Sequence, residues 1–189
     1  MKLSCFLVLA VLMFTSCKQD KRSMIEIKTD LGIIVAELYT DKAPKTCANF
    51  IQYIEQQAYD GAHFYRTVRL DNQPENSVKI EVIQGGIDPK EAMFSPAEHE
   101  TTKVTGVLHE NGTLSMARYE PGTATTEFFI CIGRQPELDF GGKRNPDGQG
   151  FAAFGRVTEG MDIVKAIQQL KDEDQMLVHP VTIQSIIIK

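Results

Sequence analysis

Eight short segments of the chain alternate apolar and polar residues or are rich in β-branched and aromatic residues, both typical of β-strands. Loops containing glycine or proline separate most of them, and Asp30-Leu31-Gly32 predicts a tight hairpin between the first two. The predicted strands cover residues 24–29, 33–39, 63–68, 79–84, 112–117, 127–133, 151–157 and 181–189.

Two further segments have the periodicity of amphipathic helices. Residues 43–57 place Cys47, Phe50 and Ile54 on one helical face, and a second helix is predicted at residues 161–170. Eight strands and two helices in a domain of this size predict a mainly β fold. We expect a closed eight-stranded antiparallel barrel, with one helix to cap each open end.

The first residues differ in character from the rest of the chain. Lys2 precedes an apolar run from Leu3 to Phe14, which ends in small residues before Cys17. This arrangement is typical of a secretory signal and is too short for a comfortable membrane span. The segment Phe14-Thr15-Ser16-Cys17 resembles a bacterial lipoprotein box, in which the cysteine becomes the lipidated N-terminus. The alternative is an ordinary signal peptide cleaved nearby, with Cys17 incidental.

The lipoprotein interpretation divides the chain into three parts. These are a signal peptide at residues 1–16, a lipidated tether at residues 17–23 and one folded domain at residues 24–189. It predicts an exported protein that is lipid-anchored to the bacterial cell envelope, on the periplasmic side or at the cell surface.

Composition and motifs exclude several classes of function. The chain of 189 residues has a net charge of −5 and no long run of Lys or Arg, which argues against a nucleic-acid surface. Cys47 and Cys131 lie in predicted apolar elements, so we expect buried free thiols rather than a disulfide framework. The four histidines lack the spacing of metal ligands, and the sequence contains no HExxH, GxSxG, P-loop or GxGxxG motif. Neither a metal nor a cofactor is expected.

Six short motifs occur in order along the predicted strands and loops. They are Phe64-Tyr65-Arg66, Gln84-Gly85-Gly86, Leu114 to Ala117, Phe128 to Ile130, Leu138-Asp139 and Phe154 to Val157. Their order and spacing resemble the cyclophilin-type peptidyl-prolyl isomerases, whose motifs read F-H-R, Q-G-G, L-S-M-A, F-F-I, L-D and F-G-x-V. No single motif is decisive, but the ordered set is specific and extends over residues 24–189.

The resemblance implies an eight-stranded antiparallel barrel capped by two helices, in agreement with the independent strand count. It also implies cis/trans isomerisation of X-Pro peptide bonds without metal or cofactor. The expected partners are proline-containing segments of exported proteins, and the protein is expected to be a monomer.

The resemblance also implies roles for individual residues. Arg66 would be the catalytic arginine, and Gln84 would order the substrate backbone and support that arginine. The backbone of Ala117 and Arg118 would hydrogen-bond the bound peptide. The apolar wall of the proline pocket would contain Val82, Phe129 and Leu138.

The chain departs from the family pattern at several positions. Segments 69–79 and 140–150 are longer than usual, and four residues replace the types found in many members: Glu81 for Phe, Glu137 for a rim Trp, Phe151 for His and Glu127 for Gln. Glu127 and Phe151 are still expected to contact substrate.

These departures leave two main functions open. The first is an exported prolyl isomerase that assists the folding of envelope proteins. The second is a binding or chaperone module that holds proline segments with little turnover. A barrel that binds a small apolar ligand would need a hollow interior, whereas the many large apolar strand residues predict a packed one.

Overall fold

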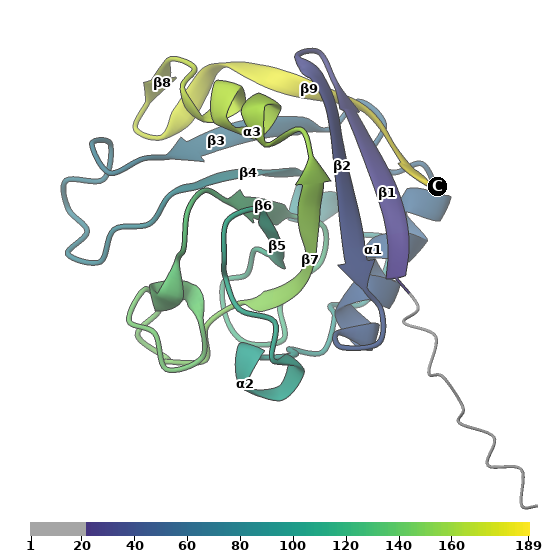
Figure 1. Cartoon of the computed structure of the whole chain (residues 1–189), viewed down its shortest axis with the longest axis horizontal. Helices are drawn as coiled ribbons and strands as arrows, with labels where there is room; N and C mark the ends of the chain where they lie inside the picture. The colour runs from purple at the N-terminus through teal and green to yellow at the C-terminus, as the bar shows by residue number, and fades with distance from the viewer. Residues whose placement is uncertain (1–21) are drawn as a thin grey trace, which may run out of the picture.

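Nine strands among the described residues, 22–189, form one antiparallel sheet in this computed structural model (Figure 1). Their order is β1-β2-β7-β5-β6-β4-β3-β9-β8, and β1 also pairs with β9, which closes the sheet into a barrel. Strand β8 has 2 residues and pairs with β9 alone, so the closed barrel has eight strands, as predicted. The predicted signal peptide and Cys17 lie outside the described residues.

The strands and helices follow one another along the chain with short connections. The strands are β1 (Arg22–Thr29), β2 (Gly32–Tyr39), β3 (His63–Val68), β4 (Val82–Gly86), β5 (Thr113–Met116), β6 (Phe128–Cys131), β7 (Ala152–Glu159), β8 (Asp172–Glu173) and β9 (Met176–Ile188). The helices are α1 (Pro44–Glu55), α2 (Thr102–Thr105) and α3 (Met161–Gln168), with 3-10 turns at Pro89–Glu91 and Pro136–Leu138.

Most strand limits differ from the predicted ones by one or two residues, and two strands differ by more. Strand β4 begins at Val82 rather than at residue 79, because the side chain of Gln73 occupies both backbone groups of Ile80. The Ile80 N–H donates to Gln73 Oε1 (3.3 Å), and Gln73 Nε2 donates to the Ile80 carbonyl (2.6 Å). Strand β9 begins at Met176 rather than at residue 181, since Met176 already pairs with β8 and β3.

Large apolar side chains fill the barrel interior. Alternation along each strand places one face inward, and the fully buried set includes Phe64, Phe128 and Phe154 from three different strands. Phe50 of α1 packs among them, with its ring centroid 5.3 Å from that of Phe128 and 5.0 Å from that of Phe154. The interior is therefore packed, as predicted, and a hollow ligand-binding barrel is excluded.

Helices α1 and α3 lie near opposite ends of β2 (Figure 1). Helix α1 begins at Pro44, whose fixed φ and missing N–H are tolerated in a first turn, and it contacts β2, β7 and β9. Helix α3 contacts β2, β3 and β4. Among the described residues, no helix has both the length and the apolar character needed to cross a bilayer.

Cys47 and Cys131 are buried free thiols, as predicted. Burial raises the pKa of Cys47 to about 12 and also raises the pKa of Cys131, so neither thiol ionises near neutral pH. Cys131 belongs to a second, smaller apolar cluster with Val82, Phe129 and Leu138. This cluster is separate from the main core and forms the floor of the site described below.

We expect Phe128→Ala to lower the free energy of unfolding by about 3–5 kcal/mol, because it leaves a cavity among the packed aromatic rings. Urea titration measures this loss. Val104, which is 79% exposed, provides a control: Val104→Ala should change stability by less than about 0.5 kcal/mol. A loss below about 1 kcal/mol for Phe128→Ala would contradict the packed interior.

Candidate active site

A bulge in β3 places Arg66 on the outer face of the barrel. The register of β3 against both β4 and β9 shifts between Phe64 and Arg66, and Tyr65 is skipped in both pairings. Strict alternation would put Arg66 on the same side as Phe64, which is fully buried in the core. The extra residue makes Tyr65 and Arg66 both face outward, which explains a charged side chain within an apolar strand.

Strand β4, which pairs with β3 at the bulge, has glycine at two consecutive positions, Gly85 and Gly86. A Cβ on Gly85 would lie 2.5 Å from the His63 carbonyl oxygen, and one on Gly86 would lie 2.6 Å from the Thr126 carbonyl oxygen. Gly86 also has φ +133°, which a residue with a side chain rarely adopts. The motif Gln84-Gly85-Gly86 is therefore a glutamine followed by two positions where only glycine fits.

Strand pairing brings three of the predicted residues into one row across the barrel wall. Arg66 of β3 pairs with Gln84 of β4, and Gln84 pairs with Phe129 of β6. The row lies in a cavity of about 410 Å³ on the outside of the barrel, which we call the groove.

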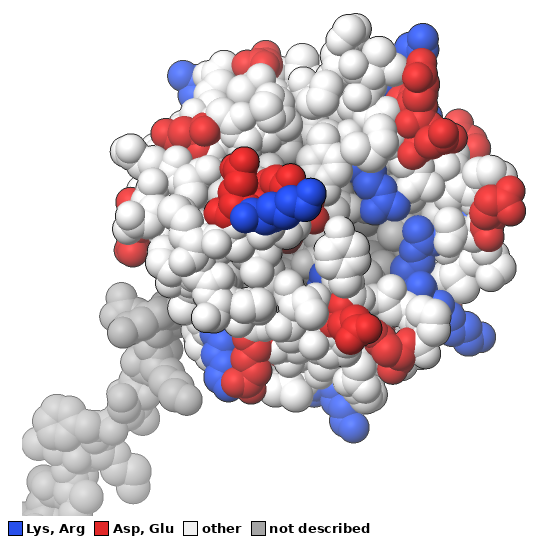
Figure 2. All heavy atoms as spheres, turned by 180° about the vertical axis from the view of Figure 1, so that it is seen from behind, with Lys and Arg blue, Asp and Glu red and all other residues white. Residues whose placement is uncertain are grey.

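All nine predicted catalytic and substrate-binding residues line the groove: Arg66, Val82, Gln84, Ala117, Arg118, Glu127, Phe129, Leu138 and Phe151. The face shown in Figure 2 is hollowed near the middle of the view, and basic side chains lie beside this hollow. The structure thus brings the predicted set together, while the role of each residue stays a prediction.

The floor of the groove is apolar and rigidly supported. Phe129 is 4% exposed and packs edge-on against Phe151, with ring centroids 5.3 Å apart. On another side it stacks with His109 at 6.0 Å. The His109 ring is held at both nitrogens, with Nδ1 2.7 Å from Asp139 Oδ1 and Nε2 2.9 Å from Ser115 Oγ. The floor is therefore a fixed apolar surface.

Arg66 is held from two sides by neutral side-chain amides. Its Nη1 donates to Gln84 Oε1 (2.8 Å), while Nη2 and Nε donate to Gln175 Oε1 (2.6 and 3.2 Å). Burial lowers the pKa of Arg66, but an arginine remains charged at every physiological pH. Because both partners are neutral, the guanidinium keeps its full positive charge in a fixed orientation.

A second chain of hydrogen bonds fixes the amide of Gln84. Gln84 Nε2 donates to the Tyr65 hydroxyl (2.8 Å), which in turn donates to Glu127 Oε1. Burial raises the pKa of Tyr65 and also the pKa of Glu127. With its NH₂ group directed to Tyr65, Gln84 must direct its carbonyl oxygen to Arg66.

Arg118 is held by the long segment 140–150. Its guanidinium forms a two-point ion pair with Asp147 (2.8 and 3.0 Å), and its Nε donates to the Gly150 carbonyl (2.8 Å). It also lies over the Phe151 ring, with Cζ 5.2 Å from the centroid. The Arg118 side chain is 1% exposed, so it stabilises the wall of the groove.

Two of the unusual glutamates lie outside the groove lining. Glu81 accepts a hydrogen bond from Gln168 of α3 (3.4 Å), and Glu137 accepts one from the backbone N–H of Lys143 (2.8 Å). No group of three or more His, Cys, Asp or Glu side chains in the described part of the chain could hold a metal ion.

Comparison with known proteins agrees with this arrangement. The model of the family described as cyclophilin type peptidyl-prolyl cis-trans isomerase matches residues 24–188. The chain belongs to this family. A peptidyl-prolyl cis-trans isomerase of Streptomyces antibioticus is 34% identical to it over 88% of this chain and 96% of that protein. Peptidyl-prolyl cis-trans isomerase B of Escherichia coli is 33% identical over 77% of this chain and 84% of that protein.

A solved structure shares the fold. The cyclophilin-type isomerase of Cryptosporidium parvum superposes with a TM-score of 0.71 over 89% of this chain and 98% of that chain, at 20% identity. The protein is thus a peptidyl-prolyl cis-trans isomerase built on a cyclophilin barrel.

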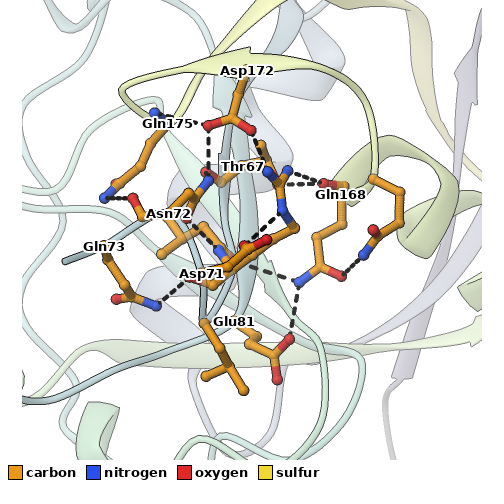
Figure 3. Close-up of polar contacts among 12 residues, drawn as sticks. Thr67, Asp71, Asn72, Gln73, Glu81, Gln168, Asp172 and Gln175 are labelled. Atoms are coloured by element: carbon orange, nitrogen blue, oxygen red, sulfur yellow. Dashed lines mark hydrogen bonds and ion pairs between the residues drawn. The ribbon is translucent and has the colours of Figure 1, made fainter.

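Sequence reasoning missed Gln175, which completes the support of Arg66 in this isomerase. Gln175 lies in the turn between β8 and β9 with φ +71°. Its N–H donates to Asp172 Oδ2 (3.1 Å), and its Nε2 donates to the Asn72 carbonyl (3.1 Å) (Figure 3). Arg69 also bonds to Asp172, so the turn is anchored to the segment that follows β3. No motif marks this residue, since it is 109 positions from Arg66 in sequence.

We expect Gln175→Gly to lower kcat/KM for an Ala-Pro peptide about three- to tenfold, because Arg66 loses one of two supports while Gln84 still holds the other. Glycine suits the positive φ, so the substitution should not destabilise the turn. A coupled isomerisation assay gives the rate, and a thermal melt tests the fold.

Asp174→Gly is the matched control, since Asp174 lies in the same turn with φ +50° and does not bond to Arg66. It should keep parental activity. If Gln175→Gly is as active as the parent, Gln175 is not needed to position Arg66.

Proposed function

We propose that this isomerase is a lipid-anchored enzyme of the bacterial cell envelope that acts on X-Pro bonds of exported proteins, with Arg66 as its catalytic residue. The observation that carries the catalytic assignment is a charged guanidinium, held by two neutral amides, beside a fixed apolar floor. The apolar segment before Cys17 supports export and lipidation.

The reaction is opposed by the resonance of the peptide bond. Rotation has a barrier of about 18–20 kcal/mol, and X-Pro isomers interconvert in tens to hundreds of seconds without a catalyst. In the twisted transition state the proline nitrogen becomes pyramidal and regains a lone pair. A donor directed at this nitrogen bonds the transition state more strongly than the planar ground state, which is the condition for catalysis.

Arg66 supplies only part of the acceleration. A turnover of about 10³ s⁻¹ requires a barrier near 13 kcal/mol, which is about 6 kcal/mol below the uncatalysed one. A hydrogen bond to a charged group contributes about 1.5–3 kcal/mol. The remainder must come from the apolar floor of Val82, Phe129 and Leu138, which gathers the proline ring and removes water from the imide.

Backbone contacts complete the proposed binding mode. Ala117 and Arg118 follow β5 at the edge of the groove, and Arg118 is immobilised by Asp147. Their backbone groups would hold the peptide on one side of the proline. The reaction requires no proton transfer, so the Tyr65–Glu127 pair serves to orient Gln84.

Arg66→Ala should lower kcat/KM for an Ala-Pro peptide by about ten- to a hundredfold, because the transition state loses a charge-assisted hydrogen bond. A protease-coupled or NMR exchange assay measures the rate. Arg134→Ala is the matched control, since the Arg134 side chain is 68% exposed and does not line the groove. Equal rates for the parent and Arg66→Ala would reject the assignment of Arg66.

Cys17→Ser should move the protein from the membrane fraction to the soluble fraction when the full chain is expressed in a bacterial host, because serine cannot carry the lipid. Fractionation followed by immunoblotting measures the distribution, and Cys5→Ser serves as the control within the signal. Membrane retention of Cys17→Ser would contradict lipid anchoring.

A further inference from the structure

Three arginines line the groove, and only one of them is neutralised within the described part of the chain. Arg118 is paired with Asp147 at two points. No ion pair among residues 22–189 includes Arg66 or Arg144. The groove therefore contains three arginines and one carboxylate, Glu127, on a protein whose net charge is −5.

Arg144 comes from the long segment after Leu138 and is fixed by neutral acceptors. Its Nη1 donates to the Val78 carbonyl (2.7 Å) and to Gln73 Oε1 (3.2 Å), and its N–H donates to the Glu137 carbonyl (3.1 Å). Arg144 thus joins the two unusually long segments, 69–79 and 140–150. Because the side chain is already ordered, a ligand that binds it loses little further conformational entropy.

Arg66 and Arg144 line the same groove, and burial together with the positive charge of Arg66 lowers the pKa of Arg144. The carboxylate that lines the groove, Glu127, accepts a hydrogen bond from Tyr65. Glu127 directly precedes β6 and lies beside the Gly85 end of β4. Arg144 bonds to Val78, which precedes the opposite end of β4, at Val82. The groove therefore has an acidic end at Glu127 and a basic end at Arg144, with the apolar floor between them.

We propose that Arg144 makes the groove select X-Pro segments that carry an acidic side chain, Asp or Glu, within two residues of the proline. A carboxylate there would bind the free donors of Arg144 while the proline ring lies on the floor. This inference rests on the isomerase activity of the same groove and adds the class of substrate that the groove prefers.

The test compares matched peptides that differ by one charge. Each peptide holds a single X-Pro bond and carries Glu or Gln at one of the two positions before or the two after the proline, with Ala at the other three. The parent enzyme should isomerise at least one Glu peptide with a kcat/KM about three- to tenfold above that of its Gln partner, a range discounted for partial solvent exposure. The preference should decline at high ionic strength, because salt screens a partly exposed charge pair.

Arg144→Gln should bring the Glu-to-Gln ratio close to one, and Arg144→Lys should retain part of the preference. Lys143→Gln removes the same charge from the neighbouring exposed residue and should leave the ratio unchanged. A parental ratio of one at every position, or a preference that survives in Arg144→Gln, would overturn the inference. The Gln peptides alone report the basal isomerase activity, so failure of that activity is distinguishable from failure of the acidic preference.

Discussion

Two consecutive residues of β3, Tyr65 and Arg66, face the same side of the barrel wall because the pairing of β3 with β4 shifts by one residue between Phe64 and Arg66. This bulge decides where the charge lies. A regular strand would direct Arg66 into an interior filled by aromatic rings, where an unpaired guanidinium would cost far more than the fold could tolerate. Of the two glycines after Gln84, Gly85 approaches the backbone of His63 and Phe64 beside the bulge, and Gly86 approaches the backbone of Thr126 and Glu127 before β6, so neither position has room for a side chain.

The chemical nature of the groups that hold Arg66 matters as much as their geometry. Gln84 and Gln175 accept hydrogen bonds from it without carrying charge. A carboxylate at either position would orient the guanidinium equally well, but it would cancel the field that a developing lone pair experiences. Arg144 follows the same principle with a backbone carbonyl and Gln73, whereas Arg118 is paired with Asp147 and stabilises the wall. Arg66 and Arg144, which bond only to neutral acceptors, thus remain available to bind a ligand, whereas Arg118 has a structural role.

Much of the fold could be predicted from the sequence, because alternation and helical periodicity are local properties. The eight barrel strands and the two main helices could be predicted, with the largest errors at β4 and β9, where a Gln73 side chain and a hairpin to β8 set the limits. The nine groove residues were found through the order of motifs, since strand register is a long-range property that no single segment encodes. Gln175 and Arg144 could not be found this way: both lie in polar loops, and nothing local distinguishes Arg144, which lines the groove, from the exposed Lys143.

The turn that carries Gln175 also ties the site to the order in which the chain is synthesised. Gln175 directly precedes β9, the strand that pairs with both β1 and β3 and closes the barrel. Gln175 follows Arg66 by 109 residues, so Arg66 lacks one of its two supports, and β3 one of its two partner strands, until the Gln175 turn and β9 have joined the sheet. The support of Arg66 is therefore completed by the same segment that closes the barrel.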